Sequence, residues 1–555
     1  MSSSIEFKLL VPYNKGAALI GSFSDWQEVP MEKDENGYFR TNVDLEDGVY
    51  HYKFRVQSKS WSNEPDEWVE IIDPYITELT PDTKNGVVRI KEGERLVDTY
   101  VWQHDDKPLP ANHELVIYEL LVSDFYHREG DNEKRGQYQD VIAKLDYLQE
   151  LGINAIELMP VNEAPGEYNW GYTPTYFFAP QPNYGSTEDL KQLIDECHAR
   201  GIRVILDQLY NHSSEESPLL QIDRDYWYYH DRHHPDDPFY WGPEFNYNHY
   251  DEHRDAIPAR DFMKAVVRFW IQEYHIDGIR YDALKQLDNR DFLNELIEET
   301  KNAVFSKPFY NIGEHIPENP DLISPNGPMD GCWHDNFYHQ IIPHLLGDEF
   351  NLEQLKQALE PKQQGYPEGI TKAITYLSNH DQKRLMVQLG EHSILDDAAF
   401  KRAKLGVVLL MTSVGAPMLW MGEEFGERTD INVDEKNQQL EWSLLENERN
   451  GGLFEYYKGL IALRKQNPAL QTGNLKFFHD GSDGKVFAYE RWNDQGSRVF
   501  VIVNFSEQYL EGYQVPDIPE NGTWHEWTRD YDVQAEDNQL TIDMGEYEAQ
   551  VFVWQ

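Results

Sequence analysis

Between residues 113 and 467, short apolar runs alternate with longer segments whose apolar residues recur at helical spacing. Runs such as "LVIYELLV", "INAIELMPV" and "IRVILDQL" have the length and composition of buried strands. In the segment after the first of them, Val141, Leu145 and Leu148 fall at i, i+4 and i+7, which is typical of an amphipathic helix. Eight apolar strands alternating with eight amphipathic helices predict a (β/α)8 TIM barrel. The sixth strand, near "DGCWHDNF", has the weakest pattern.

The two ends of the chain have a different pattern of apolar and polar residues. Residues 1–103 contain alternating runs such as "YHYKFRV" between turn clusters, which predicts an N-terminal β-sandwich. After residue 468 the runs "KVFAYERW", "RVFVIVNF" and "QVFVWQ" predict a C-terminal antiparallel β domain. We therefore predict three domains, 1–103, 104–467 and 468–555, with a small aromatic-rich domain inserted in the barrel at about residues 212–260. The α/β fold class follows from the central domain.

Charge and cysteine content narrow the classes of partner. The formal charge is −49, from 98 acidic and 49 basic residues, which argues against nucleic acid and anionic membranes. The two cysteines, Cys197 and Cys332, imply no disulfide framework and fit a reducing compartment. The start "MSSSIEFKLL" has no basic segment followed by an apolar one, so we expect a cytoplasmic protein. The long apolar stretch from Leu405 is interrupted by "TS" and "GAP", and it is interpreted as a buried helix leading into a buried strand.

Polar residues follow several of the predicted strands, where a barrel of this kind builds its active site. A single Arg-x-Asp pair is more often a structural ion pair, but this set of strand ends together favours a site. The candidates are Asp207, Asn211 and His212 after the third strand, Arg280 and Asp282 after the fourth, Glu314 after the fifth, and His380 and Asp381 after the seventh.

Paired carboxylates at one rim suit the hydrolysis of a glycosidic bond, in which one attacks and the other donates a proton. Asp282 lies beside Arg280, so we expect it to stay ionised and act as the nucleophile. Glu314 has no basic neighbour in its local sequence and follows an apolar strand. Burial would raise its pKa, which suits a general acid. Asp381, His212 and His380 are expected to hydrogen-bond sugar hydroxyls.

Four short motifs, "DQLYNH", "GIRYDALK", "IGEH" and "LSNHD", occur in this order at the predicted strand ends. In them the chain resembles the α-amylase family of glycoside hydrolases, and the resemblance covers nearly the whole sequence. It implies that Asp282 is the nucleophile, Glu314 the general acid/base and Asp381 the transition-state stabiliser. It also implies that Arg280, His212, His380, Asp207 and Lys285 contact the substrate. The family retains anomeric configuration, which implies a separation of about 5–5.5 Å between the Asp282 and Glu314 carboxyl groups.

Other segments extend the resemblance. "NWGYTPTYFFAP" (169–180) is similar to a family segment in which Tyr172 would stack on the central sugar, although a buried Trp-Tyr pair is the alternative. "GSFSDWQEVPM" and "VYHYKFRVQSKSW" resemble a glycogen-binding module, which would place Trp26, Lys53 and Trp61 on glucan. In many multidomain relatives such a module only braces the barrel.

No cofactor is expected. Structural calcium is possible in the family, but Asn211 is the one calcium-ligand position that matches, and Gln286 replaces a histidine common in relatives. We therefore assign no metal ligand and leave structural calcium open.

The motifs leave the reaction itself open. Hydrolysis and transglycosylation share one covalent intermediate and differ in the acceptor. The expected activity is a retaining hydrolase of α-1,4-linked glycogen, starch or maltooligosaccharides. A 1,4-α-glucan branching enzyme is the next alternative, then a maltooligosyltrehalose trehalohydrolase. A non-catalytic glucan-binding protein is a minor alternative. The partner in each case is a neutral α-glucan.

Overall fold

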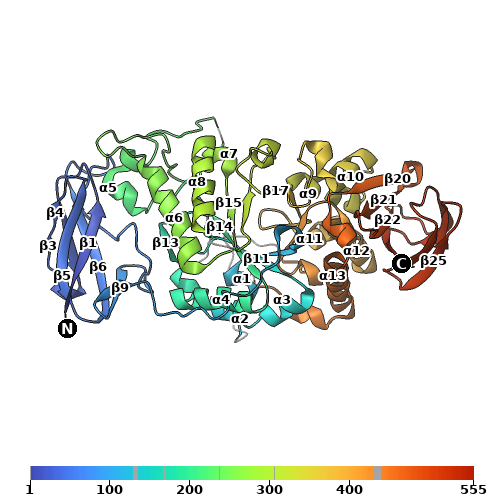
Figure 1. Ribbon diagram of the computed structural model, residues 1–555, viewed down its shortest axis with the longest axis horizontal. Coiled ribbons are helices and arrows are strands. Elements are labelled where there is room, and N and C mark those ends of the chain that lie inside the picture. The colour runs from blue at the N-terminus through green and yellow to red at the C-terminus, as the bar shows by residue number, and fades with distance from the viewer. Residues whose placement is uncertain (1, 129–134, 167–169, 237, 305–306, 430–438) are drawn as a thin grey trace.

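The computed structural model describes residues 2–128, 135–166, 170–236, 238–304, 307–429 and 439–555. Its parts lie in line, with N-terminal strands at one end, a barrel in the centre and C-terminal strands at the other end (Figure 1). The fold class predicted from the sequence is confirmed, because a closed parallel barrel is flanked by two β modules. The division at residues 103 and 467 stays a prediction.

The barrel strands close in chain order, and every one runs parallel to its neighbours. Pairing of β10 with β19, which sets Ile117 opposite Met418, completes the ring. The sixth strand lies where the sequence placed it, at β17. The strands are β10 (Ile117–Leu120), β11 (Ala155–Leu158), β14 (Arg203–Gln208), β15 (Gly278–Tyr281), β16 (Tyr310–Gly313), β17 (Gly331–Trp333), β18 (Ala373–Thr375) and β19 (Ala416–Trp420).

Helices surround the barrel, and α6, for example, buries one apolar face with Phe262, Val266 and Trp270, whereas residues 405–412 of α12 are buried on all sides. The apolar stretch from Leu405 forms the end of α12 and then β19, as expected, with the turn at Gly415 (φ +148°). The helices are α1 (Val122–Phe125), α2 (Tyr138–Ile142), α3 (Leu145–Leu151), α4 (Thr187–Ala199), α5 (Pro218–Trp227), α6 (Pro258–Tyr274), α7 (Leu284–Leu287), α8 (Arg290–Ala303), α9 (Asp335–Leu346), α10 (Leu352–Leu359), α11 (Leu385–Glu391), α12 (Asp396–Thr412) and α13 (Glu448–Gln466).

The structure corrects the expected helix pattern in three places. The connection from β16 to β17 contains a 3-10 helix, η4 (Pro320–Ile323), in place of an α-helix. Four prolines between residues 317 and 328 explain this, because proline lacks the N–H that an α-helix needs. A further helix, α9, follows the sixth strand. The expected single helix at 138–151 is split into α2 and α3, where Lys144 N–H bonds to Val141 O in a tighter turn.

The N-terminal module consists of two sheets around a core that includes Phe7, Leu19 and Phe54. One sheet contains β1 (Ser3–Leu10), β5 (Tyr38–Leu45) and β4 (Glu32–Lys33). The other contains β3 (Val29–Pro30), β2 (Ala17–Gly21), β6 (Gly48–Gln57), β8 (Gly86–Lys91) and β9 (Glu94–Leu96), with β7 (Trp68–Ile71) on β6.

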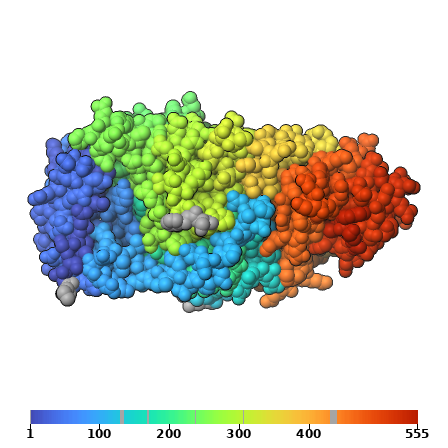
Figure 2. Space-filling model, viewed as in Figure 1, coloured from blue at the N-terminus to red at the C-terminus, as the bar shows by residue number. Residues whose placement is uncertain are grey.

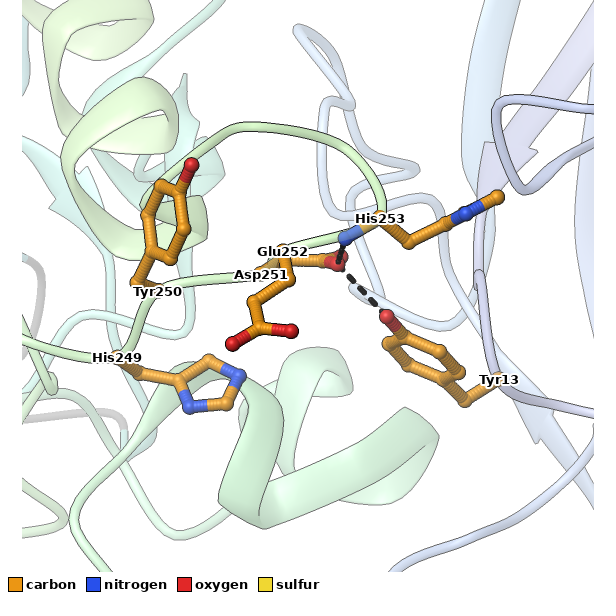
Figure 3. Close-up of a pocket in the computed structure, with 6 residues that line it drawn as sticks. All are labelled: Tyr13, His249, Tyr250, Asp251, Glu252 and His253. Atoms are coloured by element: carbon orange, nitrogen blue, oxygen red, sulfur yellow. Dashed lines mark hydrogen bonds between the residues drawn. The ribbon is translucent and has the colours of Figure 1, made fainter.

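This module packs on the inserted segment, residues 212–260, which contains α5. In the space-filling view the blue module and the green insertion are continuous at one end of the molecule (Figure 2). Asn14 donates to Ile222 O at 2.9 Å, and Tyr13 donates to Asp251 at 2.7 Å beside a shallow pocket (Figure 3). Tyr226 donates to the other oxygen of Asp251 at 2.7 Å. The module is therefore fixed to the barrel through the insertion.

The C-terminal domain has a core of its own, centred on Phe500, Trp524 and Phe552. Its main sheet has the order β20-β21-β22-β27-β24-β25, and β23 pairs with β26. The strands are β20 (Leu475–Gly481), β21 (Val486–Trp492), β22 (Arg498–Asn504), β23 (Leu510–Val515), β24 (Gly522–Glu526), β25 (Tyr531–Ala535), β26 (Leu540–Met544) and β27 (Glu548–Trp554).

Candidate active site

Arg280 is the centre of the polar cluster at the carboxyl ends of the barrel strands. Its Nη1 donates to Asp282 Oδ1 at 2.6 Å and to both carboxylate oxygens of Asp207 at 2.9 Å. Its Nη2 lies 3.7 Å from Glu314 Oε2. The guanidinium carbon stands 4.1 Å from the centroid of the Trp333 ring, so the ring face supports the charge from the sixth strand. One fully buried cation thus holds carboxylates from three consecutive strands.

Burial and Arg280 shift the pKa values of the two candidate catalytic carboxyls in opposite directions. Burial raises the pKa of Asp282 to about 6 and that of Glu314 to about 7, while Arg280 lowers both. The expectation that Asp282 would lie beside Arg280 is met, but its pKa is raised because burial outweighs the guanidinium. The local sequence of Glu314 was misleading, since Arg280 reaches this residue from another strand. Asp282 accepts a charge-assisted hydrogen bond from Arg280, which favours its ionised form, whereas the raised pKa of Glu314 suits a proton donor.

The backbone after Asp282 positions Glu314. Ala283 adopts a left-handed conformation (φ +52°), which costs a non-glycine residue about 1–3 kcal/mol. In this conformation its N–H donates to Glu314 Oε2 at 2.6 Å, and Leu284 N–H donates to Glu314 O at 3.0 Å. Because Oε2 accepts a hydrogen bond, a neutral Glu314 carries its proton on Oε1.

His380 lies between Asp381, the third predicted catalytic acid, and Glu119 in the barrel interior. Its Nδ1 donates to Glu119 Oε1 at 2.6 Å, and its Nε2 lies 3.4 Å from Asp381 Oδ2. Burial alone would lower the pKa of His380, but Asp381 and Glu119 together raise it to about 9, so the ring is a cation near neutral pH. The Asp381 side chain is 47% exposed, against 14% for Asp282 and Glu314. Asp381 therefore stands on the open side of the cluster, while the other two acids lie deeper.

Tyr172 contacts the same cluster through Asp207 and His380. Its hydroxyl donates to Asp207 at 2.6 Å, and its ring stacks on His380 with centroids 5.0 Å apart. His212 Nε2 donates to Tyr172 O at 2.8 Å and its Nδ1 accepts from Asn211 at 3.2 Å, which defines a neutral ring. Burial agrees with this, because it lowers the pKa of His212 to about 4. The stacking of Tyr172 on a sugar stays a prediction; here its ring is partly buried against histidine.

The remaining predicted contacts lie outside this cluster. Lys285 is exposed on α7, near the same rim. Trp26 and Trp61 are 41% and 55% exposed on the N-terminal module, and Lys53 lies 3.9 Å from Glu70. Trp61 faces the insertion, where the Arg224 guanidinium stands 5.0 Å from its ring centroid. Their contact with glucan stays a prediction.

Three residues of the site were not predicted from the sequence: Glu119, Glu157 and Trp333. The two glutamates are each the one charged residue of a short barrel strand, in "IYEL" and "AIEL", and this signal was available in the sequence. They lie opposite each other in the register of β10 and β11, each 1% exposed. Trp333 gave no such signal, because a tryptophan after an apolar pair is usually core.

In the part of the chain that the structure describes, no three His, Cys, Asp or Glu side chains are grouped so as to hold a metal ion. Within the same ranges, no helix has both the length and the apolar character needed to cross a membrane. Cys197 and Cys332 are free and buried.

Comparison with known proteins agrees with this geometry. Residues 122–443 match the family model of the alpha amylase catalytic domain, and residues 478–555 match the alpha amylase C-terminal all-beta domain. Residues 13–70 match the glycogen recognition site of AMP-activated protein kinase. Because the catalytic match covers more than half of the chain, the protein belongs to the α-amylase family.

Individual relatives have several different names. A malto-oligosyltrehalose trehalohydrolase of Saccharolobus solfataricus is 26% identical over 523 residues, covering 83% of this chain and 85% of that protein. A 1,4-alpha-glucan branching enzyme GlgB of Prochlorococcus marinus is 26% identical over 594 residues, covering 94% and 75%. The solved structure of a type I pullulanase from Bacillus subtilis, complexed with maltose, superposes with a TM-score of 0.81 at 22% identity, covering 100% of this chain and 84% of that one. The last similarity concerns the fold.

Proposed function

We propose that the protein is a retaining α-glucan hydrolase that cleaves α-1,4-glucosidic bonds of glycogen, starch or maltooligosaccharides. The observation that carries the proposal is the position of Arg280, 2.6 Å from Asp282 and 3.7 Å from Glu314, at one rim of the barrel. Asp282 receives the charge-assisted hydrogen bond from Arg280, whereas Glu314 has a raised pKa and accepts the Ala283 hydrogen bond through Oε2, which leaves Oε1 to carry the proton. These are the two states that double displacement at an acetal carbon requires.

The first chemical step forms a covalent intermediate. Asp282 attacks the anomeric carbon, and the bond from this carbon to the glycosidic oxygen breaks as Glu314 transfers its proton to that oxygen. The product is a glycosyl ester of Asp282 and a glucan with a new free 4-hydroxyl group. Arg280 keeps Asp282 oriented, and Asp381, on the open side, accepts hydrogen bonds from sugar hydroxyls as the ring distorts.

The second step releases the enzyme. Glu314, now ionised, takes a proton from water, whose oxygen attacks the anomeric carbon and displaces Asp282. A sugar hydroxyl in place of water gives transglycosylation, so the same residues would serve a branching enzyme. The similarity to GlgB proteins supports that reaction as the second candidate, and the similarity to a trehalohydrolase supports α-1,4 cleavage beside trehalose as the third.

The deciding experiment uses amylose as substrate. Reducing ends and iodine staining are followed together, and the products are sized after enzymatic debranching. Rising reducing ends with falling staining are expected for the hydrolase. Falling staining without new reducing ends, together with new α-1,6 branches, would establish the branching enzyme instead. Turnover of maltooligosyltrehalose alone would establish the trehalohydrolase, and binding of glucan without turnover of any of these would remove the enzyme assignment.

A further inference from the structure

Half-exposed aromatic rings lie on the N-terminal module and on the insertion that leads from it to the candidate active site. Trp61, after β6, is 55% exposed, and Tyr240 and Trp241 in the insertion are 45% and 44% exposed. After α5, which packs on the module, the insertion runs along one edge of the molecule toward α7 (Figure 1). Exposed apolar groups that gather in this way mark binding surfaces.

Side-chain contacts connect Trp61 with Tyr240. The Arg224 guanidinium stands 5.0 Å from the Trp61 ring centroid, and its Nη1 lies 3.5 Å from Glu215 Oε2. The other oxygen of Glu215 accepts a hydrogen bond from the Tyr240 hydroxyl at 3.2 Å. One ion pair therefore links a ring of the module to a ring of the insertion.

The same series continues to the rim of the barrel. Trp241 follows Tyr240 directly, and its ring lies 6.0 Å from the His212 ring. Phe239 lies parallel to Trp241, at 4° and 5.7 Å, and supports it from one side. His212 in turn binds the backbone of Tyr172, whose ring stacks on His380 in the candidate active site.

The chemistry of these groups selects a ligand. Arg224 lies against Trp61, Arg232 stands 5.2 Å from the Tyr240 ring centroid, and Phe239 stacks on Trp241. Each of the three rings is nevertheless about half exposed, which is the arrangement that a sugar ring needs for stacking. Arg224 supplies donors and Glu215 acceptors for hydroxyl groups between the rings. The net charge of −49 disfavours anionic polymers, whereas a neutral chain meets no such repulsion.

We propose that Trp61, Tyr240 and Trp241 form an aromatic track that holds a single α-glucan chain and leads it from the N-terminal module to the active site. The ligand class rests on the proposed function, but the binding does not depend on which reaction follows. The track makes the insertion, rather than the module alone, the determinant of preference for long chains.

The test compares variants on short and long glucans. Trp61→Ala, Tyr240→Ala and the double variant are assayed on maltotriose and on amylose, and their binding to glycogen is measured by native affinity electrophoresis. Tyr250→Ala is the matched control, because Tyr250 is 52% exposed on the same insertion but lines the separate pocket beside Tyr13 (Figure 3). Loss of one stacked ring should weaken glycogen binding about tenfold. The same factor should appear in kcat/KM for amylose relative to maltotriose, with Tyr250→Ala unchanged.

Further arms keep the outcomes distinct. Tyr240→Phe keeps the ring and should bind glycogen as the parent protein does, which excludes a general folding defect as the cause. Wild-type retardation by glycogen without amylose turnover would reject the proposed hydrolase and leave the track standing. Equal losses on maltotriose and amylose, or glycogen binding by the double variant at the parent's affinity, would overturn the track.

Discussion

The two ends of β15 carry aspartates with opposite environments. Asp277, just before the strand, accepts from His198 Nε2 at 2.9 Å and Val204 N–H at 2.8 Å, and it forms an ion pair with Lys307 at 2.8 Å. Burial alone would raise its pKa, but Lys307 and His198 hold the pKa of Asp277 at about 2. At the other end, the pKa of Asp282 is raised to about 6.

The contrast lies in how fully the oxygens are occupied. Asp277 Oδ2 accepts the bonds from His198 and Val204, and Oδ1 lies 2.8 Å from the Lys307 ammonium in an ion pair. Among the described residues, Asp282 receives one side-chain hydrogen bond, from Arg280 to Oδ1. A carboxylate whose oxygens both face buried protein partners stabilises the fold and has little capacity left for a ligand. A carboxylate with free lone pairs at the open end of the barrel is available for chemistry.

The largest expected effect is at Asp282. Asp282→Asn removes the proposed nucleophile but keeps the shape and one acceptor for Arg280, so we expect kcat/KM on amylose to fall by about 10⁴ or more. The urea midpoint should stay close to that of the parent protein. Turnover within tenfold of the parent would show that the two ends of the strand had been assigned to the wrong roles.

Glu314→Gln removes the proposed proton donor and should lower kcat/KM on amylose by about 10²–10⁴. A maltosyl fluoride needs no proton on its leaving group, so the first step with this substrate should be largely restored. Asp282→Asn should gain nothing from the fluoride, because its nucleophile is missing. A rescue pattern reversed between the two variants would exchange the assigned roles.

The sequence predicted which acids lie close together better than it predicted their pKa values. Strand-end position was enough to bring Asp207, Asp282 and Glu314 to one rim, because parallel strands in a barrel end on the same face. The raised pKa of Asp282 depends on burial by distant segments, and the contact of Glu314 with Arg280 crosses from one strand to the next. Neither can be read from local sequence. The helix missing before β17 was, in contrast, foreseeable from its four prolines.

Asp277→Asn tests the end of β15 at which the carboxylate faces buried protein partners. Its loss leaves Lys307 and His198 without their carboxylate, which should lower the free energy of unfolding by about 3 kcal/mol. Activity at a temperature where the variant is folded should remain near that of the parent. Urea titration followed by far-ultraviolet circular dichroism measures the first quantity, and amylose turnover the second.

The pH dependence of stability should also reflect the low pKa of Asp277. The folded pKa of Asp277, about 2, lies below the unfolded value of about 3.9. Its contribution of about 2–3 kcal/mol is therefore fully present above pH ~5 and is lost as pH falls toward 2. The parent should lose this stability between those pH values, and Asp277→Asn should lose less. Equal acid sensitivity of the two proteins would contradict the assignment.

The pH dependence of activity should reflect the open end of the strand. Asp282 must be ionised and Glu314 protonated, so kcat/KM should be bell-shaped, with an acid limb near pH 6 and an alkaline limb near pH 7. Outside the limbs, activity should fall about tenfold per pH unit. Glu314→Gln, assayed with the fluoride, should lose the alkaline limb in the first step, whereas an unchanged limb would assign it to another group.

The smallest effects are expected one layer below, at the opposed pair Glu119 and Glu157. Glu119 accepts from the His380 ring at 2.6 Å and from its backbone N–H at 3.2 Å, whereas neither oxygen of Glu157 has a hydrogen-bond partner in the described structure. Burial and the neighbouring Glu119 raise the pKa of Glu157 well above its usual value, so this carboxyl is neutral. Glu157→Gln replaces one neutral group with another of the same shape and should change kcat/KM less than twofold.

Glu119→Gln should instead lower the pKa of His380 and loosen its hold beside Asp381. We expect kcat/KM to fall about tenfold, mainly through kcat, because Asp381 acts on the distorted sugar rather than on the ground state. The pKa of His380, followed by NMR of the ring, should fall from about 9 in this variant and stay unchanged in Glu157→Gln. If both variants lose activity equally and the His380 resonance does not move, Glu119 and Glu157 serve packing alone. The difference between carboxylates occupied by protein partners and carboxylates available for chemistry would then hold only at the rim of the barrel.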